Sequence, residues 1–327
     1  MQSCNRNSYK TNKIGYISKV ETFAARWATQ KMLYFGRKQS YTCNMHTNVQ
    51  NRLSFFAYIC CAIAICYGTT FFYPRWKVTG TESTISFDVS GYYWYLPSAF
   101  IYHDIKHQAF KDSILQKYRP SNAVFVQGTR LENGNYVMKY SSGMAVMYLP
   151  FFTLSHLAAI ALGYPQDGFS LPYQIGIQYG GLLVFFIGLW YLRRLLLLFY
   201  DDRVVAIVLA LLVFGTNYLE FSAIDSGMSH CWLFTVYVFL ILNTIYFYRL
   251  FEVKYAIRIG LLVGLAMLTR PTDAIACLIP ILWGMEHISL VSIGKQVKLF
   301  VAHYQPLLLA MAAHQIIVIW TALLTPS

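Results

Sequence analysis

Long apolar stretches separated by short polar joints dominate the chain. They cover residues 53–73, 144–163, 173–192, 204–221, 231–248, 257–269, 274–285 and 306–324. Most of them approach the ~20 apolar residues that a helix needs to cross the hydrocarbon core of a bilayer. A transmembrane β-barrel would alternate apolar and polar residues in segments of about ten, and these stretches do not alternate. The pattern predicts an all-α polytopic membrane protein.

The composition agrees with a membrane protein. Of the 327 residues, 57% are hydrophobic and only 12% are charged, whereas soluble domains carry about 25% charged residues. The net charge of +12 is concentrated in residues 1–52, where Glu21 is the one acid. That excess is typical of a cytoplasmic segment before a first membrane helix. We therefore expect a cytoplasmic N-terminus and no nucleic-acid partner. A transit peptide, or a start near Met45, is the alternative for this segment.

The basic joints between the apolar stretches predict the topology, because Lys and Arg favour cytoplasmic loops. These joints contain Arg193, Arg194 and Arg203; Arg249, Lys254 and Arg258; and Lys295 and Lys298. Placing them inside puts residues 222–230 and 270–273 on the outer face. This arrangement requires that 144–163, which contains Pro150, does not cross fully. We expect it to be bent, partial or a tight hairpin within a transmembrane region of residues 53–327.

The segment 74–143 forms a predicted outer loop. It contains an aromatic run at 92–102, a possible helix at 111–118 and a turn-rich stretch at 131–136. Tyr and Trp favour the membrane–water interface, and amphipathic helices lie along it. The loop is therefore expected to hold juxtamembrane helices along the outer membrane surface.

Asp88, in the stretch FDVSGYYWYLP (87–97), is the candidate general base. A carboxylate in a partly desolvated site can accept a proton during catalysis. The other interpretation of this residue is a helix N-cap or a solvated loop acid. Tyr92 and Tyr93 follow it and are candidates for contact with a substrate.

Two cations are candidates for binding phosphate. Lys139 precedes Gly143 at the start of the second apolar stretch, where it could hold a phosphate as a point charge. A snorkelling interface lysine is the alternative. Arg270 interrupts an apolar region at LTRPTD (268–273), and arginine at an outward-facing break suits a phosphate or pyrophosphate. The alternative is a cytoplasmic arginine, but this orientation would place the neighbouring joints on the wrong sides of the membrane.

The joint GTNYLEFSAIDSGMSH (215–230) adds Asp225 and His230. Ionisable residues at membrane depth are costly and mark functional sites by default. A simple polar loop explains Asp225 but explains His230 less well, because His230 opens an apolar stretch. The sequence contains no P-loop, Rossmann glycine pattern or metal-ligand cluster, so we expect no cofactor and no metal.

Four motifs in order carry a resemblance to a known family. They are FDVSGYYWYLP, KYSSGMAVMYLPFF, FGTNYLEFSAIDSGMSH and GLAMLTRPTD, and they span residues 53–290. In this order and spacing the chain resembles membrane glycosyltransferases of the GT-C fold. It is closest to the bacterial protein-mannosyltransferase and aminoarabinose-transferase-like branch, family 39.

The resemblance implies a helical bundle in the bacterial inner or plasma membrane. Such an enzyme moves a sugar from a polyprenyl-phosphate donor to a lipid, glycan or protein acceptor on the periplasmic face. The family's proposed base falls on Asp88, its donor-phosphate lysine on Lys139, and its basic residue at the later helix break on Arg270. Asp225 and His230 match a polar outer joint whose role in the family is less settled.

The chain also departs from the family pattern. Val89 stands where many relatives have a second acid, and Ser141 and Ser142 replace a common pair of prolines. Relatives are usually longer, so a truncated or inactive homologue is one alternative reading. A polytopic transporter or lipid-carrier flippase is the other, because such proteins also contain broken helices and intramembrane charges.

Overall fold

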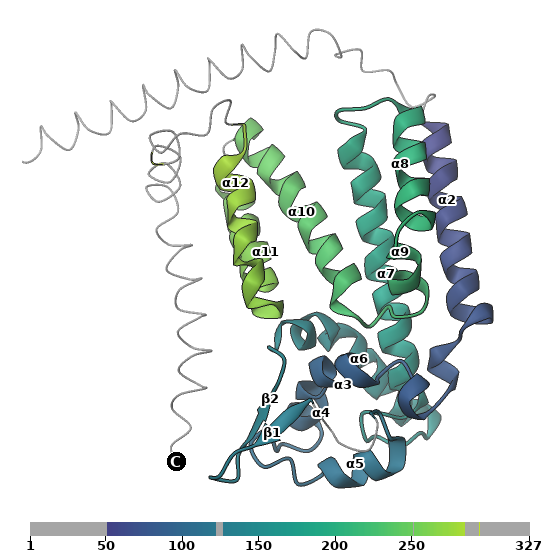
Figure 1. Cartoon of the computed structure of the whole chain (residues 1–327), viewed down its shortest axis with the longest axis vertical. Helices are drawn as coiled ribbons and strands as arrows, with labels where there is room; N and C mark the ends of the chain where they lie inside the picture. The colour runs from purple at the N-terminus through teal and green to yellow at the C-terminus, as the bar shows by residue number, and fades with distance from the viewer. Residues whose placement is uncertain (1–50, 122–126, 251, 285–293, 295–327) are drawn as a thin grey trace, which may run out of the picture. The chain divides into compact units, whose positions relative to one another are not determined.

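The chain is described by a computed structural model that covers residues 51–121, 127–250, 252–284 and 294. Within this part the structure is mostly helical, and its strands form one two-stranded antiparallel sheet. Figure 1 shows long helices above a layer of short helices and the small sheet. The basic segment 1–50 and the apolar stretch 306–324 lie outside the described residues.

The elements of the described part follow a simple order along the chain. They are α2 (Arg52–Tyr67), η1 (Gly68–Phe72), η2 (Arg75–Lys77), η3 (Gly80–Glu82), α3 (Phe87–Tyr93), α4 (Tyr95–Phe100), α5 (Lys111–Tyr118), β1 (Gly128–Arg130), β2 (Tyr136–Met138), α6 (Gly143–Leu162), α7 (Leu171–Leu196), α8 (Asp202–Phe214), α9 (Tyr218–Ala223), α10 (Ser229–Leu250), α11 (Val253–Thr269), η4 (Pro271–Cys277) and α12 (Leu278–Leu282).

The predicted apolar stretches form helices wherever the structure describes them. Four helical segments are long and apolar enough to cross a membrane: Arg52–Lys77, Gly143–Leu162, Leu171–Leu196 and Ser229–Leu250. The expected stretch 204–221 is instead divided into α8 and α9 near Gly215. The stretch 274–285 is likewise represented by the turns of η4 followed by the short α12.

One end of the bundle joins α2, α7 and α8. The carboxylate of Asp202 accepts hydrogen bonds from the backbone N–H groups of Leu53 at 2.9 Å and Ser54 at 3.1 Å. The first N–H groups of a helix have no partner within it, so Asp202 of α8 satisfies two of these groups in α2. Arg193, near the end of α7, donates from Nε to Ser54 Oγ at 2.8 Å. The starts of α2 and α8 and the end of α7 therefore lie together.

The opposite end brings together α6, α10 and α11. A Cβ added to Gly143, the first residue of α6, would overlap the backbone nitrogen of Thr269, the last residue of α11. Arg270 follows directly and donates from Nη2 to Ser229 Oγ, at the start of α10, at 2.7 Å. Glycine is needed at position 143 because the two backbones approach so closely.

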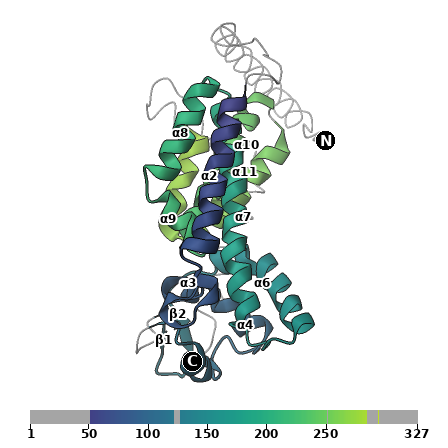
Figure 2. The same ribbon diagram turned by 90° about the vertical axis from the view of Figure 1, so that its right-hand side faces the viewer.

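Helix α6 is continuous, which differs from the tight hairpin considered for 144–163. It contains Pro150 and ends at Gly163, whose φ of 71° provides a left-handed C-terminal cap. It packs antiparallel to α7, with Phe151 against Gly180 and Ser155 against Gly176. The chain reverses between α6 and α7, and Figure 2 shows α6 beside the lower part of α7, close to α3 and α4.

The first part of the aromatic run packs inside the protein, so these side chains do not reach toward a membrane surface. Tyr92, Tyr93 and Trp94 are between 0% and 4% exposed. They form a core with residues of α6 and the start of α7, including Tyr148 and Phe169. Aromatic rings bury a large apolar area each, so the run stabilises the layer itself. The predicted helix at 111–118 is confirmed as α5.

Candidate functional site

Two glutamines of α7 fix the chain just before Asp88. Gln174 Oε1 accepts a hydrogen bond from the backbone N–H of Ile85 at 2.8 Å. Gln178 Oε1 accepts one from Thr84 Oγ1 at 2.9 Å, and its amide nitrogen donates to the carbonyl of Ala223 at 3.1 Å. Both glutamines are buried, and buried polar groups need such partners. They anchor residues 84 and 85 on α7.

The backbone turns sharply into α3 at Phe87. Its φ is 42°, a left-handed conformation that costs a residue with a side chain roughly 1–2 kcal/mol. The backbone N–H of Phe87 donates to the carbonyl of Pro120 at 2.8 Å. This hydrogen bond to a distant residue stabilises the conformation of Phe87. The first turn of α3 follows, and it contains the half-buried Asp88. Strain of this kind is often found at functional sites.

Tyr140 is the partner of Asp88. Burial raises the pKa of the Tyr140 hydroxyl, and its hydrogen bond to the Asp88 carboxylate raises that pKa further. The Tyr140 ring covers Gly91, where a Cβ would lie 2.6 Å from Cδ2 of the tyrosine. It also packs on the ring of Tyr92, with 4.3 Å between centroids. Tyr140 therefore remains a neutral hydrogen-bond donor at physiological pH.

Arg270 reaches the same tyrosine from the end of α11. The positive charge of Arg270 lowers the pKa of the Tyr140 hydroxyl, opposing the larger effects of burial and of Asp88. One guanidinium nitrogen contacts Ser229 Oγ at 2.7 Å and lies 3.5 Å from Nε2 of His230. The ammonium of Lys139 lies 4.9 Å from the centroid of the Tyr140 ring. Two cations and one carboxylate thus surround Tyr140.

The structure brings four of the expected site residues near Tyr140, namely Asp88, Tyr92, Lys139 and Arg270. A fifth, His230, lies beside Arg270. Tyr92 is only 4% exposed, so it supports the Tyr140 ring and offers no open face to a sugar. Lys139 and His230 are exposed, whereas Asp88 and Arg270 are half-buried.

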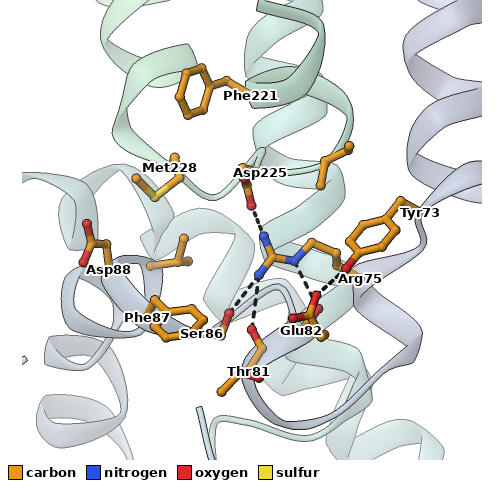
Figure 3. Close-up of a pocket in the computed structure, with 12 residues that line it drawn as sticks. Tyr73, Arg75, Thr81, Glu82, Ser86, Phe87, Asp88, Phe221, Asp225 and Met228 are labelled. Atoms are coloured by element: carbon orange, nitrogen blue, oxygen red, sulfur yellow. Dashed lines mark hydrogen bonds and ion pairs between the residues drawn. The ribbon is translucent and has the colours of Figure 1, made fainter. Parts of the chain in front are cut away.

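Asp225 lies on the other side of Asp88 and has a different partner. Its carboxylate forms an ion pair with Arg75. Both residues line a cavity of about 440 Å³ that Asp88 also lines. Figure 3 shows Asp88 at one side of this cavity and the Arg75–Asp225 pair at the other. The expected role of Asp225 in substrate binding is therefore limited by its engagement with Arg75.

Tyr93 lies outside the cluster around Tyr140. It is fully buried, and its hydroxyl donates to the carbonyl of Gly168 at 2.5 Å. Its ring packs edge-on against Phe169 with 5.6 Å between centroids. Consecutive residues of a helix point about 100° apart, which follows from 3.6 residues per turn. Tyr92 and Tyr93 therefore cannot both face the site.

Sequence reasoning missed the partners of the two acids. Tyr140 is adjacent to the candidate Lys139 and stands three residues before Gly143, and this position near the predicted helix start was the available signal. Arg75 follows the first apolar stretch, where a basic residue is ordinary, so nothing in the sequence paired it with Asp225. Within residues 51–121, 127–250 and 252–284, no cluster of His, Cys, Asp and Glu could hold a metal ion.

The arrangement pairs a hydrogen-bonded carboxylate with two cations across one tyrosine. Such a site can accept a proton at Asp88 and stabilise negative charge near Arg270 and Lys139. No protein-family model, curated protein or solved structure matches the chain.

Proposed function

We propose that the chain is a polytopic membrane glycosyltransferase that uses a polyprenyl-phosphate sugar. The membrane part of this proposal rests on apolar helices long enough to cross a bilayer. In the proposed topology α6, although long enough, lies beside the first half of α7 and does not cross, so that both of its ends are outside. It also rests on the position of basic residues, since Arg193 and the start of α8 lie at the end of the bundle opposite to Arg270. By the distribution of positive charge, the end with Arg193 is cytoplasmic and the end with Asp88 is outside.

This topology is tested by labelling single cysteines in intact cells. Gln166, in the exposed connection between α6 and α7, and Arg203, at the start of α8, are both exposed. A membrane-impermeant maleimide should label Gln166→Cys from outside and label Arg203→Cys only after permeabilisation. Labelling of Gln166→Cys only after permeabilisation would refute the topology, because it would place in the cytoplasm the short helices α3, α4 and α5 and the β1–β2 sheet, which we call the outer layer.

The observation that carries the enzymatic proposal is the proximity of Arg270 to the helix of Asp88. Arg270 Nη2 contacts Ser229 Oγ at 2.7 Å, which lies 3.5 Å from the hydroxyl of Tyr92 in α3, and both charges act on the pKa of Tyr140. Residues far apart in the sequence contribute opposite charges to one hydroxyl group. A displacement at a sugar carbon needs a base for the attacking hydroxyl and cations for the departing phosphate. A carrier would instead concentrate polar residues at the middle of its membrane helices, whereas Asp88 belongs to the short helix α3 of the outer layer.

The proposed reaction is a single in-line displacement. The acceptor oxygen attacks the anomeric carbon and forms the new glycosidic bond while its proton passes to Asp88. The bond between the anomeric carbon and the phosphate oxygen breaks, and its electron pair leaves with the polyprenyl phosphate. Arg270 and Lys139 stabilise the charge on that phosphate. The configuration at the sugar carbon inverts.

The experiment is transfer by the full chain in membranes supplied with radiolabelled polyprenyl-phosphate sugars. Replacing a general base typically lowers the rate by ~10²–10⁴-fold, so Asp88→Asn should lose transfer by that amount. Asp112→Asn, in the exposed first turn of α5, is the matched control because the Asp112 side chain is 88% exposed. Full transfer by Asp88→Asn would refute the role of Asp88.

A further inference from the structure

The cavity beside Asp88 is lined by neither Tyr140 nor the cations Lys139 and Arg270, and it has its own chemistry. It measures about 440 Å³, which is within the range of small-molecule sites. Its apolar side is formed by Phe87, Val89, Phe221, Ile224 and Met228. Its polar side contains Asp88, Glu82 and the Arg75–Asp225 pair (Figure 3).

Arg75, the one arginine that lines this cavity, uses most of its hydrogen-bond donors within the protein. Arg75 Nε donates to the carbonyl of Glu82 at 3.0 Å, and Nη2 donates to Ser86 Oγ at 2.9 Å and to the carbonyl of Thr81 at 3.4 Å. Nη1 donates to the carboxylate of Asp225. A guanidinium has five N–H donors, so four of them already have acceptors. An incoming phosphate would find almost no donor left on Arg75.

The remaining charge of the cavity is negative. Asp225 is neutralised by Arg75. The Glu82 carboxylate accepts a hydrogen bond from the hydroxyl of Tyr73, and this bond leaves its charge in place. Asp88 supplies a second carboxylate. A cavity with two carboxylates and an occupied arginine repels anions and attracts cations or hydroxyl donors.

We infer that this cavity is the acceptor site, and that it takes a polyol or amino-sugar acceptor bearing no phosphate or carboxylate near the reacting hydroxyl. The inference rests on the proposed function. Asp88 borders both the cavity and the cations around Tyr140, so an acceptor in the cavity and a donor phosphate near Arg270 meet across this carboxylate. Acceptor and donor enter from regions of opposite charge, which prevents the acceptor from competing for the phosphate-binding cations.

The first test measures the charge selectivity of the cavity without enzymatic activity. Met228→Cys places a thiol at its lining. The full chain is treated with the cationic trimethylammonioethyl and the anionic sulfonatoethyl methanethiosulfonate, and the parent protein reports the reaction of the native cysteines. After correction for the rates with a free thiol, the cationic reagent should react roughly tenfold faster. Adding Glu82→Gln should reduce this preference roughly threefold. Equal corrected rates would overturn the inference.

The second test uses two acceptors with the same octyl and pyranose frame but opposite charge, an octyl glucosaminide and an octyl glucoside 6-phosphate. The ratio of their kcat/KM values is independent of the amount of active protein. Wild type should favour the amino sugar, and Glu82→Lys should shift the ratio toward the phosphate at least tenfold. Glu132→Lys, in the exposed turn between β1 and β2, is the control and should leave the ratio unchanged.

The outcomes separate this inference from the proposed function. Transfer by wild type with a ratio that Glu82→Lys does not change would overturn the acceptor site alone. A wild-type protein that cleaves no polyprenyl-phosphate sugar, with or without acceptor, would overturn the proposed function and the acceptor role with it. The cysteine experiment would still decide whether the cavity excludes anions.

Discussion

The hydroxyl of Tyr140, three residues before the start of α6, interacts with the carboxylate of Asp88 in α3, and this hydrogen bond raises the pKa of the Tyr140 hydroxyl. The ring of Tyr140 lies against Gly91, in the turn of α3 that follows Asp88. Hydrogen bond and ring contact together fix the acid relative to the start of α6. This relationship makes Tyr140, which sequence motifs did not single out, a positioning residue of the site.

Tyr140→Phe should lower the rate of sugar transfer while the protein remains folded. A hydrogen bond to a charged group contributes about 1.5–3 kcal/mol, which corresponds to a roughly 10- to 150-fold lower rate. Tyr164→Phe, at an exposed tyrosine between α6 and α7, is the control. Initial rates at saturating donor measure the effect. A rate within twofold of wild type would show that the hydrogen bond has no role in transfer.

Gly143→Ala should displace the end of α11 and weaken both stability and activity. The new Cβ would overlap the backbone of Thr269, which cannot move as a flexible side chain does, and Arg270 is the next residue. Overpacking of this kind costs typically 1–3 kcal/mol. Unfolding in detergent and the transfer rate are both measured.

Gly264→Ala is the matched control for Gly143→Ala. Gly264 lies within α11, and a Cβ there would meet nothing within 4 Å. Alanine favours a helix interior over glycine by roughly 0.5–1 kcal/mol, so this variant should be as stable as wild type or more stable. Equal stability of the two variants would contradict the close approach of α6 to α11.

Asp225→Asn should destabilise the outer layer because it leaves Arg75 without its counter-charge. The two side chains are 13% and 24% exposed, and loss of one partner of such a bond costs about 1–3 kcal/mol. A double-mutant cycle with Arg75→Met measures the coupling. The double variant should be less destabilised than the sum of the single variants. Strict additivity would mean that the ion pair contributes nothing.

Lowering the pH should weaken the hydrogen bonds that hold the loop after α4. Asp104 accepts hydrogen bonds from the backbone N–H groups of Ala109 and His107, each at 2.8 Å. These bonds lower the pKa of Asp104 below its ordinary value, with the bond from Ala109 having the largest effect. The carboxylate therefore contributes stability above the unfolded pKa of about 3.9, and this contribution is lost as the pH falls toward the lower folded pKa.

Comparison of wild type with Asp104→Asn measures this contribution. The difference in thermal stability between the two should be present at pH 7 and should shrink as the pH falls below 4. Asp104 is only partly buried, so the effect is small, and Asp112→Asn, at an acid whose side chain is 88% exposed, is the control. A difference that stays constant across this range would contradict the expected titration.

The long helices could be predicted from the sequence because their apolar stretches are continuous. The bounds of α6, α7 and α10 lie within two residues of the predicted 144–163, 173–192 and 231–248 at every end except the C-terminus of α7. That end extends to Leu196 through Arg193 and Arg194. Long arginine side chains can remain helical and reach polar partners, as Arg193 does at Ser54.

The outer layer was harder to predict because its aromatic side chains could lie either at a membrane interface or in a protein core. Tyr and Trp favour both membrane interfaces and protein cores, and only the fold decides between them. The burial of Trp94 depends on Phe169, which lies beyond α6 in the sequence. The partners of Asp88 and Asp225 depend on similarly distant contacts, so the acids could be identified as candidates and their hydrogen bonds could not.

The cap that α8 provides for α2 has a consequence for biosynthesis. The ribosome delivers Asp202 149 residues after Leu53, when α2, α6 and α7 have already emerged. Until then Asp202 cannot accept the hydrogen bonds of the Leu53 and Ser54 amides, which need other acceptors. The start of α2 therefore gains these two hydrogen bonds only after the first residue of α8 has been synthesised, so this end of the protein assembles late.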